Sequence, residues 1–154
     1  MVRKRALITS LTGLVALTLG GVSSAHALTG PGVIRITERQ VASGRVDLGR
    51  HGPSIGDIEV TRGLLYNTHI TPKPIGHGET VCSFTGVQSR TCSGTYFLPK
   101  GKIIVGGPLL FPQFYELAVL GGTGLYSNVR GTLTVTSLTY GSRTRAVLLF
   151  RLVP

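Results

Sequence analysis

Short runs of β-branched and aromatic residues, separated by Gly, Pro, Ser and Asn, make up the chain from about residue 33 to its end. No segment there shows apolar residues at helical spacing over three turns, whereas short runs bounded by turn residues are typical of strands. We therefore predict eight strands. They are Val33–Gln40, Asp57–Tyr66, Glu79–Thr85, Thr91–Leu98, Lys102–Gly107, Phe114–Leu120, Val129–Thr139 and Thr144–Leu152.

Most connections between these strands are short, which favours antiparallel neighbours. Eight antiparallel strands can close into a barrel, and closure leaves no exposed sheet edge. The expected fold is all-β, an eight-stranded antiparallel β-barrel. A two-sheet sandwich is the alternative.

The last predicted strand is apolar on both of its faces. Ala146, Leu148 and Phe150 point to one side, and Val147 and Leu149 point to the other. A barrel whose exterior faces water should alternate more cleanly. The pattern fits either an exterior that packs on another subunit or a small barrel with scattered apolar surface residues. We expect a homo-oligomer, a dimer or a trimer.

The N-terminus has the three parts of a secretory signal. A basic Arg3-Lys4-Arg5 precedes a mostly apolar run from Ala6 to Leu19, and small residues follow up to Ala27. This run is shorter than the roughly 20 apolar residues that a spanning helix needs. We predict that residues 1–27 are a signal peptide cleaved after Ala27, that residues 28–154 form one secreted domain, and that the chain has no stable membrane span.

The chain is basic, with 16 Lys and Arg against 6 Asp and Glu. Loss of the three basic leader residues leaves a net charge of +7. The basic residues lie singly and are not interleaved with aromatic residues, so we expect no nucleic-acid partner. The charge fits solubility, or loose attraction to anionic cell-wall polymers or lipid headgroups.

Cysteine usage agrees with export. Two cysteines in an exported chain usually pair, and a turn near Val87 would place Cys82 opposite Cys92. We therefore predict a Cys82–Cys92 disulfide. The histidines show no tight ligand spacing with either cysteine, so no metal site is expected.

The segment Gly121-Gly122-Thr123-Gly124 could cradle a phosphate or reverse the chain between strands. A dinucleotide fingerprint needs a third glycine, a following helix and an acid about 20 residues on. Here Ser127 holds the third position, residues 130–136 are rich in β-branched residues, and Glu116 is the last acid. The sequence therefore predicts a strand–turn–strand corner and no nucleotide cofactor.

The block Glu116–Tyr126, followed by Val129-Arg130-Gly131, resembles the signature of the dirigent proteins and the allene oxide cyclase barrel-like family. Ile55–Val60, the cysteine pair and the segment 101–108 are also similar, most of all to secreted bacterial members. The resemblance implies an eight-stranded barrel, commonly dimeric or trimeric, with an apolar cavity open at one end. It also implies cofactor-free cyclisation of an unstable epoxide or guidance of radical coupling.

Only six acids are available for such chemistry. A cavity of this kind folds a flexible substrate into a reactive conformer, and one acid or ordered donor then stabilises charge as the ring closes. The expected catalytic residues are Asp57, Glu116 and Arg130. The expected ligand-binding residues are Glu59, Glu79, Tyr96, Tyr115 and Tyr126.

Structural alternatives stay open for several of these residues. Asp57 could cap a turn beside Gly56, and Glu116 could pair with Arg130 to hold the glycine corner. The tyrosines Tyr96 and Tyr126 could be barrel packing with a hydroxyl at the rim.

Two functions remain open at this point. In the first, a secreted allene oxide cyclase/dirigent-like barrel binds a small apolar metabolite and steers its cyclisation or coupling as a cofactor-free isomerase or cyclase. In the second, a non-catalytic secreted barrel binds lipid or associates with the cell wall. Catalysis requires an acid or a Tyr/Arg pair pointing into the cavity. If Asp57, Glu59, Glu79 and Glu116 all face solvent or are locked in ion pairs, the catalytic function is not supported.

Overall fold

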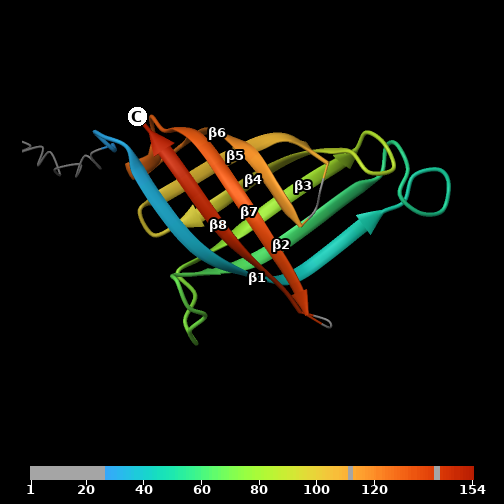
Figure 1. Ribbon diagram of the computed structural model, residues 1–154, viewed down its shortest axis with the longest axis horizontal. Coiled ribbons are helices and arrows are strands. Elements are labelled where there is room, and N and C mark those ends of the chain that lie inside the picture. Colours follow the sequence, from blue (N-terminus) through green and yellow to red (C-terminus); the bar gives the residue numbers. More distant parts are fainter. Residues whose placement is uncertain (1–26, 111–112, 141–142) are drawn as a thin grey trace, which may run out of the picture.

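Eight antiparallel strands pair in chain order and close on themselves in the computed structural model, which describes residues 27–110, 113–140 and 143–154 (Figure 1). The strands are β1 (Gly32–Val46), β2 (Ile58–Tyr66), β3 (Gly76–Phe84), β4 (Arg90–Leu98), β5 (Gly101–Leu109), β6 (Phe114–Gly122), β7 (Arg130–Tyr140) and β8 (Arg143–Val153). The predicted signal peptide lies almost entirely outside the described residues. Within the described part of the chain, no helix is long and apolar enough to span a membrane.

The pairing of β1 with β8 closes the barrel. Ile36 lies opposite Leu148 and Glu38 opposite Ala146, while the other edge of β1 pairs with β2. The predicted eight-stranded barrel is therefore confirmed, and the two-sheet alternative is wrong because no strand edge is left open between two sheets.

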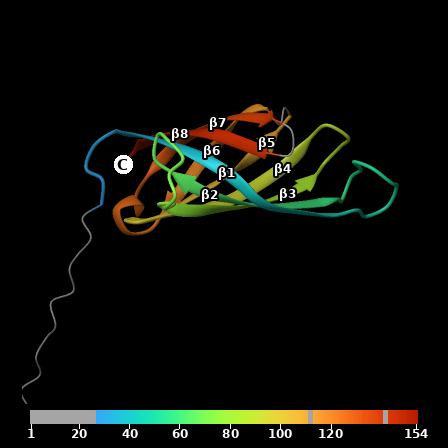
Figure 2. The same cartoon turned by 90° about the horizontal axis from the view of Figure 1, so that it is seen from below.

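The first strand is longer than its sequence pattern predicts. It continues from Gln40 to Val46, past a register shift between Gln40 and Ala42, and its last residues are exposed. This extension is held by hydrogen bonds to β2 and not by burial of its side chains. Its sequence therefore does not alternate between apolar and polar residues, and the pattern did not predict it as strand. Figure 2 shows the hairpins β1–β2 and β3–β4 projecting beyond the rest of the barrel at one end.

The interior is divided along the barrel axis. One half is filled by an apolar cluster that includes Ile103, Leu133, Leu148 and Phe150, each essentially without solvent exposure. Toward the projecting hairpins the inward positions become polar, which leaves room for the cavity described below.

The glycine corner reverses the chain between β6 and β7. It contains a single 3₁₀ turn, Gly124–Tyr126, which the sequence did not reveal and which is too short to act as a phosphate-binding helix. Gly124 has φ +62°, and a Cβ there would lie 2.5 Å from the Lys100 carbonyl oxygen. Glycine is required because the corner packs directly against the β4–β5 turn. The strand–turn–strand prediction is confirmed.

The predicted disulfide is also confirmed. Cys82 and Cys92 are directly opposite on β3 and β4 and are bonded to each other. The Thr85 amide donates to the Ser89 carbonyl at 2.9 Å, which centres the turn near Val87 as expected.

Removing the bridge should weaken the barrel without changing its fold. The double variant Cys82→Ser/Cys92→Ser should lower the free energy of unfolding by about 2–3 kcal/mol, because the unfolded chain regains the freedom of the closed loop. Urea denaturation measures this, and reduced wild-type protein is the control. Equal midpoints for the oxidised wild type and the variant would contradict the prediction.

Candidate functional site

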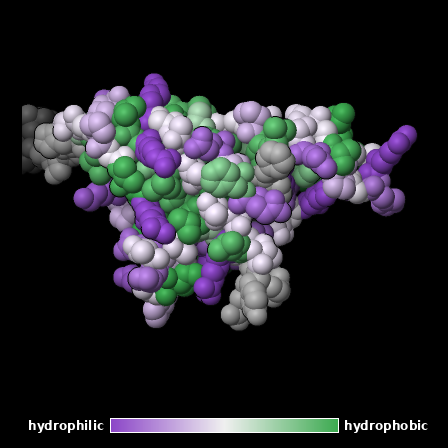
Figure 3. Space-filling model, in the orientation of Figure 1, coloured by the Kyte–Doolittle hydropathy of each residue, from purple (hydrophilic) through white to green (hydrophobic). Residues whose placement is uncertain are grey.

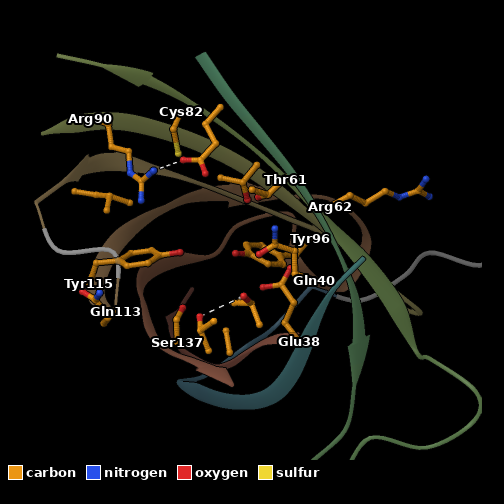
Figure 4. A pocket seen from close by; sticks show the side chains of 16 residues that line it. Glu38, Gln40, Thr61, Arg62, Cys82, Arg90, Tyr96, Gln113, Tyr115 and Ser137 are labelled. Atoms are coloured by element: carbon orange, nitrogen blue, oxygen red, sulfur yellow. Dashed lines mark hydrogen bonds and ion pairs between the residues drawn. The ribbon is translucent and has the colours of Figure 1, made fainter. Parts of the chain in front are cut away.

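A cavity of about 240 Å³ lies inside the barrel at the end where the two hairpins project (Figure 4). Its walls include Glu38, Gln40, Glu59, Arg90, Tyr96 and Tyr115. The lining is more polar than the resemblance implies, because hydroxyl, amide and charged side chains occupy most of the inward positions. The volume is somewhat below the roughly 300–1,000 Å³ typical of pockets that enclose a drug-sized molecule, so the cavity suits a small ligand.

Glu38 reaches this cavity because it shares the inward face of β1 with Ile34 and Ile36. Two glycines paired across β2 and β3, Gly63 and Gly78, make room for it. A Cβ at Gly63 would overlap the Glu38 carboxylate, and a Cβ at Gly78 would lie 3.2 Å from its Oε1. The wall is thus shaped around this side chain.

The Glu38 residue is half-buried, and its carboxylate is desolvated on the cavity wall without a compensating charge. Among the described residues it has no ion pair and no hydrogen-bond partner. Desolvation by burial raises the pKa of Glu38 to about 7. The group is therefore shared between its acid and base forms near neutral pH.

Two phenols face each other across the cavity. The hydroxyls of Tyr96 and Tyr115 point toward one another in Figure 4. Burial, and then the nearby Glu38 charge, raise the pKa of Tyr115 to about 12 and the pKa of Tyr96 well above its usual value. The Tyr96 ring meets Phe150 edge-on at 5.3 Å, which anchors it to the apolar cluster. Both phenols are neutral hydrogen-bond donors at physiological pH.

The second acid in the cavity is already paired. Glu59 accepts from the Arg90 guanidinium, which also lies over the Phe84 ring, 5.4 Å from its centroid. Arg45 approaches the same ring at 4.8 Å. This stack fixes Arg90 against the wall on the Glu59 side of the cavity.

Asp57, predicted to be catalytic, lies outside the cavity lining and has no solvent exposure. Its carboxylate accepts from the Arg45 guanidinium, the Leu48 amide at 2.8 Å, and the Ser54 amide at 2.9 Å and hydroxyl at 3.1 Å. The Arg45 hydrogen bond, followed by those of the two amides, holds the pKa of Asp57 well below its usual range. The geometry fits the alternative in which Asp57 organises the β1–β2 loop.

Glu116 and Arg130, the other two residues predicted to be catalytic, also lie away from the cavity. The exposed Glu116 accepts from the Thr134 hydroxyl at 2.9 Å, and Arg130 donates to the Val129 carbonyl at 3.1 Å. No Glu116–Arg130 ion pair joins them in the described structure, so the alternative in which this pair holds the glycine corner is not supported. Each side chain is on the outer face of its strand, where it forms a hydrogen bond with a neighbouring group instead of an ion pair with the other.

The predicted ligand-binding residues divide into two groups. Glu59, Tyr96 and Tyr115 line the cavity together. Glu79 is on the exterior, 3.7 Å from both Arg62 and His77. Tyr126 is buried in the apolar cluster, and burial raises its pKa.

The four acids on which the sequence analysis made catalysis depend are thus all exposed or ion-paired, so none of them supports it. A case for catalysis has to rest on Glu38, which the sequence analysis missed together with Arg90. A signal for Glu38 was present, because an acid stands where period-two alternation from Ile34 and Ile36 predicts an inward residue. Arg90 has no such signal, since it stands at the first position of its strand, next to the turn.

The cavity combines a carboxyl able to give or take a proton with two neutral donors. Such a set can protonate, deprotonate or polarise a bound molecule. The described residues contain no group of three or more His, Cys, Asp or Glu arranged to hold a metal ion.

Burial of Glu38 should make stability depend on pH. The native state retains the Glu38 proton up to about pH 7, whereas the unfolded chain loses it near 4.5, so stability should fall as pH rises between these values. Glu38→Gln cannot ionise, so it should not show this fall in stability between pH 4.5 and 7. The variant should exceed wild type by about 2–3 kcal/mol above pH 7 and match it below pH 4.5.

Urea denaturation between pH 4 and 8 measures this difference, and ¹³C NMR of the Glu38 carboxyl gives its pKa directly. Glu116→Gln, an exposed carboxyl, is the matched control. A Glu38 pKa near 4.5, or equal pH profiles for wild type and Glu38→Gln, would contradict the prediction.

No family model matches the sequence, and no curated protein sequence matches it significantly. Solved structures do match. A pyocyanin demethylase is 23% identical with a TM-score of 0.68, covering 79% of this chain and 100% of that one. A pterocarpan synthase dirigent protein is 11% identical with a TM-score of 0.66, covering 92% and 96% of the two chains.

The Diels–Alderase AbmU from Streptomyces koyangensis is 15% identical with a TM-score of 0.63, covering 80% of this chain and 65% of that one. Identities at this level establish the fold alone. The chain therefore has the barrel fold found in dirigent proteins and in Diels–Alderase barrels, as the resemblance in its sequence predicted.

Proposed function

We propose that the chain is an exported barrel that binds a small, uncharged organic molecule in the cavity and steers its cyclisation or coupling without a cofactor. The observation that carries this proposal is Glu38, an acid desolvated on the cavity wall with no partner among the described residues. A protein that needed only a packed interior would gain stability from an apolar residue there. The position therefore fits a role toward a bound molecule.

The surrounding groups support this assignment. A general acid or base works best when its pKa lies near the working pH, as that of Glu38 does. Tyr96 and Tyr115 can donate to an oxygen or nitrogen of the bound molecule as charge develops on it. The paired Glu59 and Arg90 keep a rigid polar wall, and the small volume restricts the molecule to few conformers.

The printed names of the structural neighbours agree with chemistry on small organic molecules. They include a pyocyanin demethylase, a pterocarpan synthase dirigent protein and a Diels–Alderase. Assembly into a dimer or trimer stays a prediction, supported by exposed Val60, Val81 and Ile104 on the outer wall.

The non-catalytic alternative has one observation in its favour. A second hollow of about 490 Å³, at the opposite end of the barrel, is lined by apolar side chains that include Leu28, Ile34, Leu98 and Leu125. An acyl chain would fit such a lining. Its described lining contains no acid, and its polar side chains are Arg35, Asn67, Lys100 and Tyr126.

Pyocyanin, the compound in the name of one neighbour, is a suitable probe of the cavity. We expect one molecule of pyocyanin to bind per chain. Absorption titrations between pH 6 and 8 measure the binding, and the affinity should change around pH 7. Glu38→Gln should weaken binding by about tenfold or more, because a hydrogen bond to a charged group is lost, and should abolish the pH dependence. Mass analysis of the bound compound then tests for conversion.

Glu116→Gln is the matched control, since it removes one carboxyl outside the cavity. If Glu116→Gln behaves like Glu38→Gln, the assignment of the site is wrong. If neither pyocyanin nor a panel of neutral two- and three-ring compounds binds saturably, the cavity is not a ligand site. If every ligand that binds is recovered unconverted, and if the purified protein carries fatty acid, the non-catalytic alternative would be favoured.

A further inference from the structure

One face of the barrel wall carries five arginines and is separate from the cavity. The outward positions of β1, β7 and β8 hold Arg35, Arg39, Arg130, Arg145 and Arg151, all of them exposed. We call this the arginine face. Figure 3 shows it as hydrophilic side chains mixed with hydrophobic ones over these strands.

Two of these arginines form a cross-strand pair that folding alone does not favour, although one of them, Arg39, also lies over the Tyr66 ring, 5.5 Å from its centroid. Arg39 lies directly opposite Arg145 on the neighbouring strand. Like charges at such positions repel each other and destabilise the sheet. Glu116 is joined to Arg151 only through the Thr134 hydroxyl, at 2.9 and 3.0 Å, and no acid among the described residues forms an ion pair with any of the five arginines. The face is therefore strongly positive, and an anionic partner would relieve the repulsion.

Exposed apolar residues stand beside these arginines. Val33 lies opposite Arg151, and Leu138 lies opposite Arg145. Val33 and Leu138 are 71% and 70% exposed. Val153, opposite Arg130, repeats the arrangement. Two kinds of anionic partner can be compared: a hydrated anionic polymer and a lipid bilayer. Exposed apolar side chains are not stabilised by contact with a hydrated polymer, but they are stabilised when they enter the headgroup region of a bilayer.

We propose that the arginine face docks the barrel onto the surface of an anionic membrane. Guanidinium groups bind phosphate through two hydrogen bonds, which suits the phosphates of lipid headgroups. A second copy of the chain is a poor partner, because two such faces repel and, of the six acidic side chains, all described, only those of Asp47, Glu79 and Glu116 are exposed. The proposal does not depend on chemistry in the cavity.

Cosedimentation of the mature chain with lipid vesicles tests this docking. Vesicles containing phosphatidylglycerol should bind the protein, and vesicles of phosphatidylcholine alone should not. The triple variant Arg35→Gln/Arg39→Gln/Arg145→Gln should lose about fivefold in affinity per arginine, or roughly 100-fold in all. Wild-type binding should also weaken as salt screens the charges.

The control Arg50→Gln/Lys73→Gln/Lys100→Gln removes the same charge from exposed positions elsewhere and should lose far less affinity. Circular dichroism verifies that both variants fold. Equal losses for the two variants would mean that net charge alone acts, and would overturn the proposal. Binding to phosphatidylcholine alone, or no binding to either vesicle, would overturn it as well.

A final variant distinguishes a membrane from a soluble anionic polymer. Val33→Ser/Leu138→Ser keeps every charge, so it should weaken binding to phosphatidylglycerol vesicles while leaving binding to soluble polyphosphate unchanged. If vesicle binding is unaffected, the apolar residues do not enter a bilayer. The partner would then be an anionic polymer, and the membrane proposal would be wrong.

Discussion

Hydrogen bonding between β1 and β8 is the interaction on which the rest of this structure depends. Once the first and last strands pair, each inward or outward position is fixed by the alternation of its strand. Glu38 cannot turn to the outer face of the barrel by a local rotation of the backbone, because the neighbouring residues of β1 are bonded on both edges. Closure therefore forces an acid into the interior, and the hydrophobic half of the barrel supplies the stability that tolerates it.

Two desolvated carboxylates in this chain show that burial alone does not determine ionisation. Asp57 is surrounded by a guanidinium, two amides and a hydroxyl, so its charged form is favoured. Glu38 has no comparable donors in the described structure, so desolvation dominates and its neutral form is favoured. The first arrangement stabilises a loop, and the second leaves a titratable group on the cavity wall. Hydrogen-bond donors lower the pKa of Asp57 although it is fully buried, and their absence leaves desolvation to raise the pKa of the half-buried Glu38.

The fold could be predicted from the sequence because its signals are local. Runs of strand residues between glycines and prolines gave the eight strands, and the spacing of Cys82 and Cys92 gave one hairpin register. The site could not be predicted as well, because it is assembled from inward positions of distant strands. Glu116 and Arg130 lie within the family-like signature, yet closure places both on the outer wall. Glu38 lies outside that signature and becomes important only when Gly63 and Gly78 come to face it.

The same alternation that builds the cavity builds the arginine face. Along β1, Ile36 and Glu38 point inward, and Arg35 and Arg39 on the same strand point outward. The cavity opens at one end of the barrel, whereas the arginines lie along its wall. A barrel docked by this wall holds its axis along the membrane surface and leaves the mouth of the cavity beside the bilayer rather than against it. A molecule leaving the headgroup region could then enter the cavity without crossing bulk water, so membrane docking and ligand capture place compatible demands on the two faces of β1.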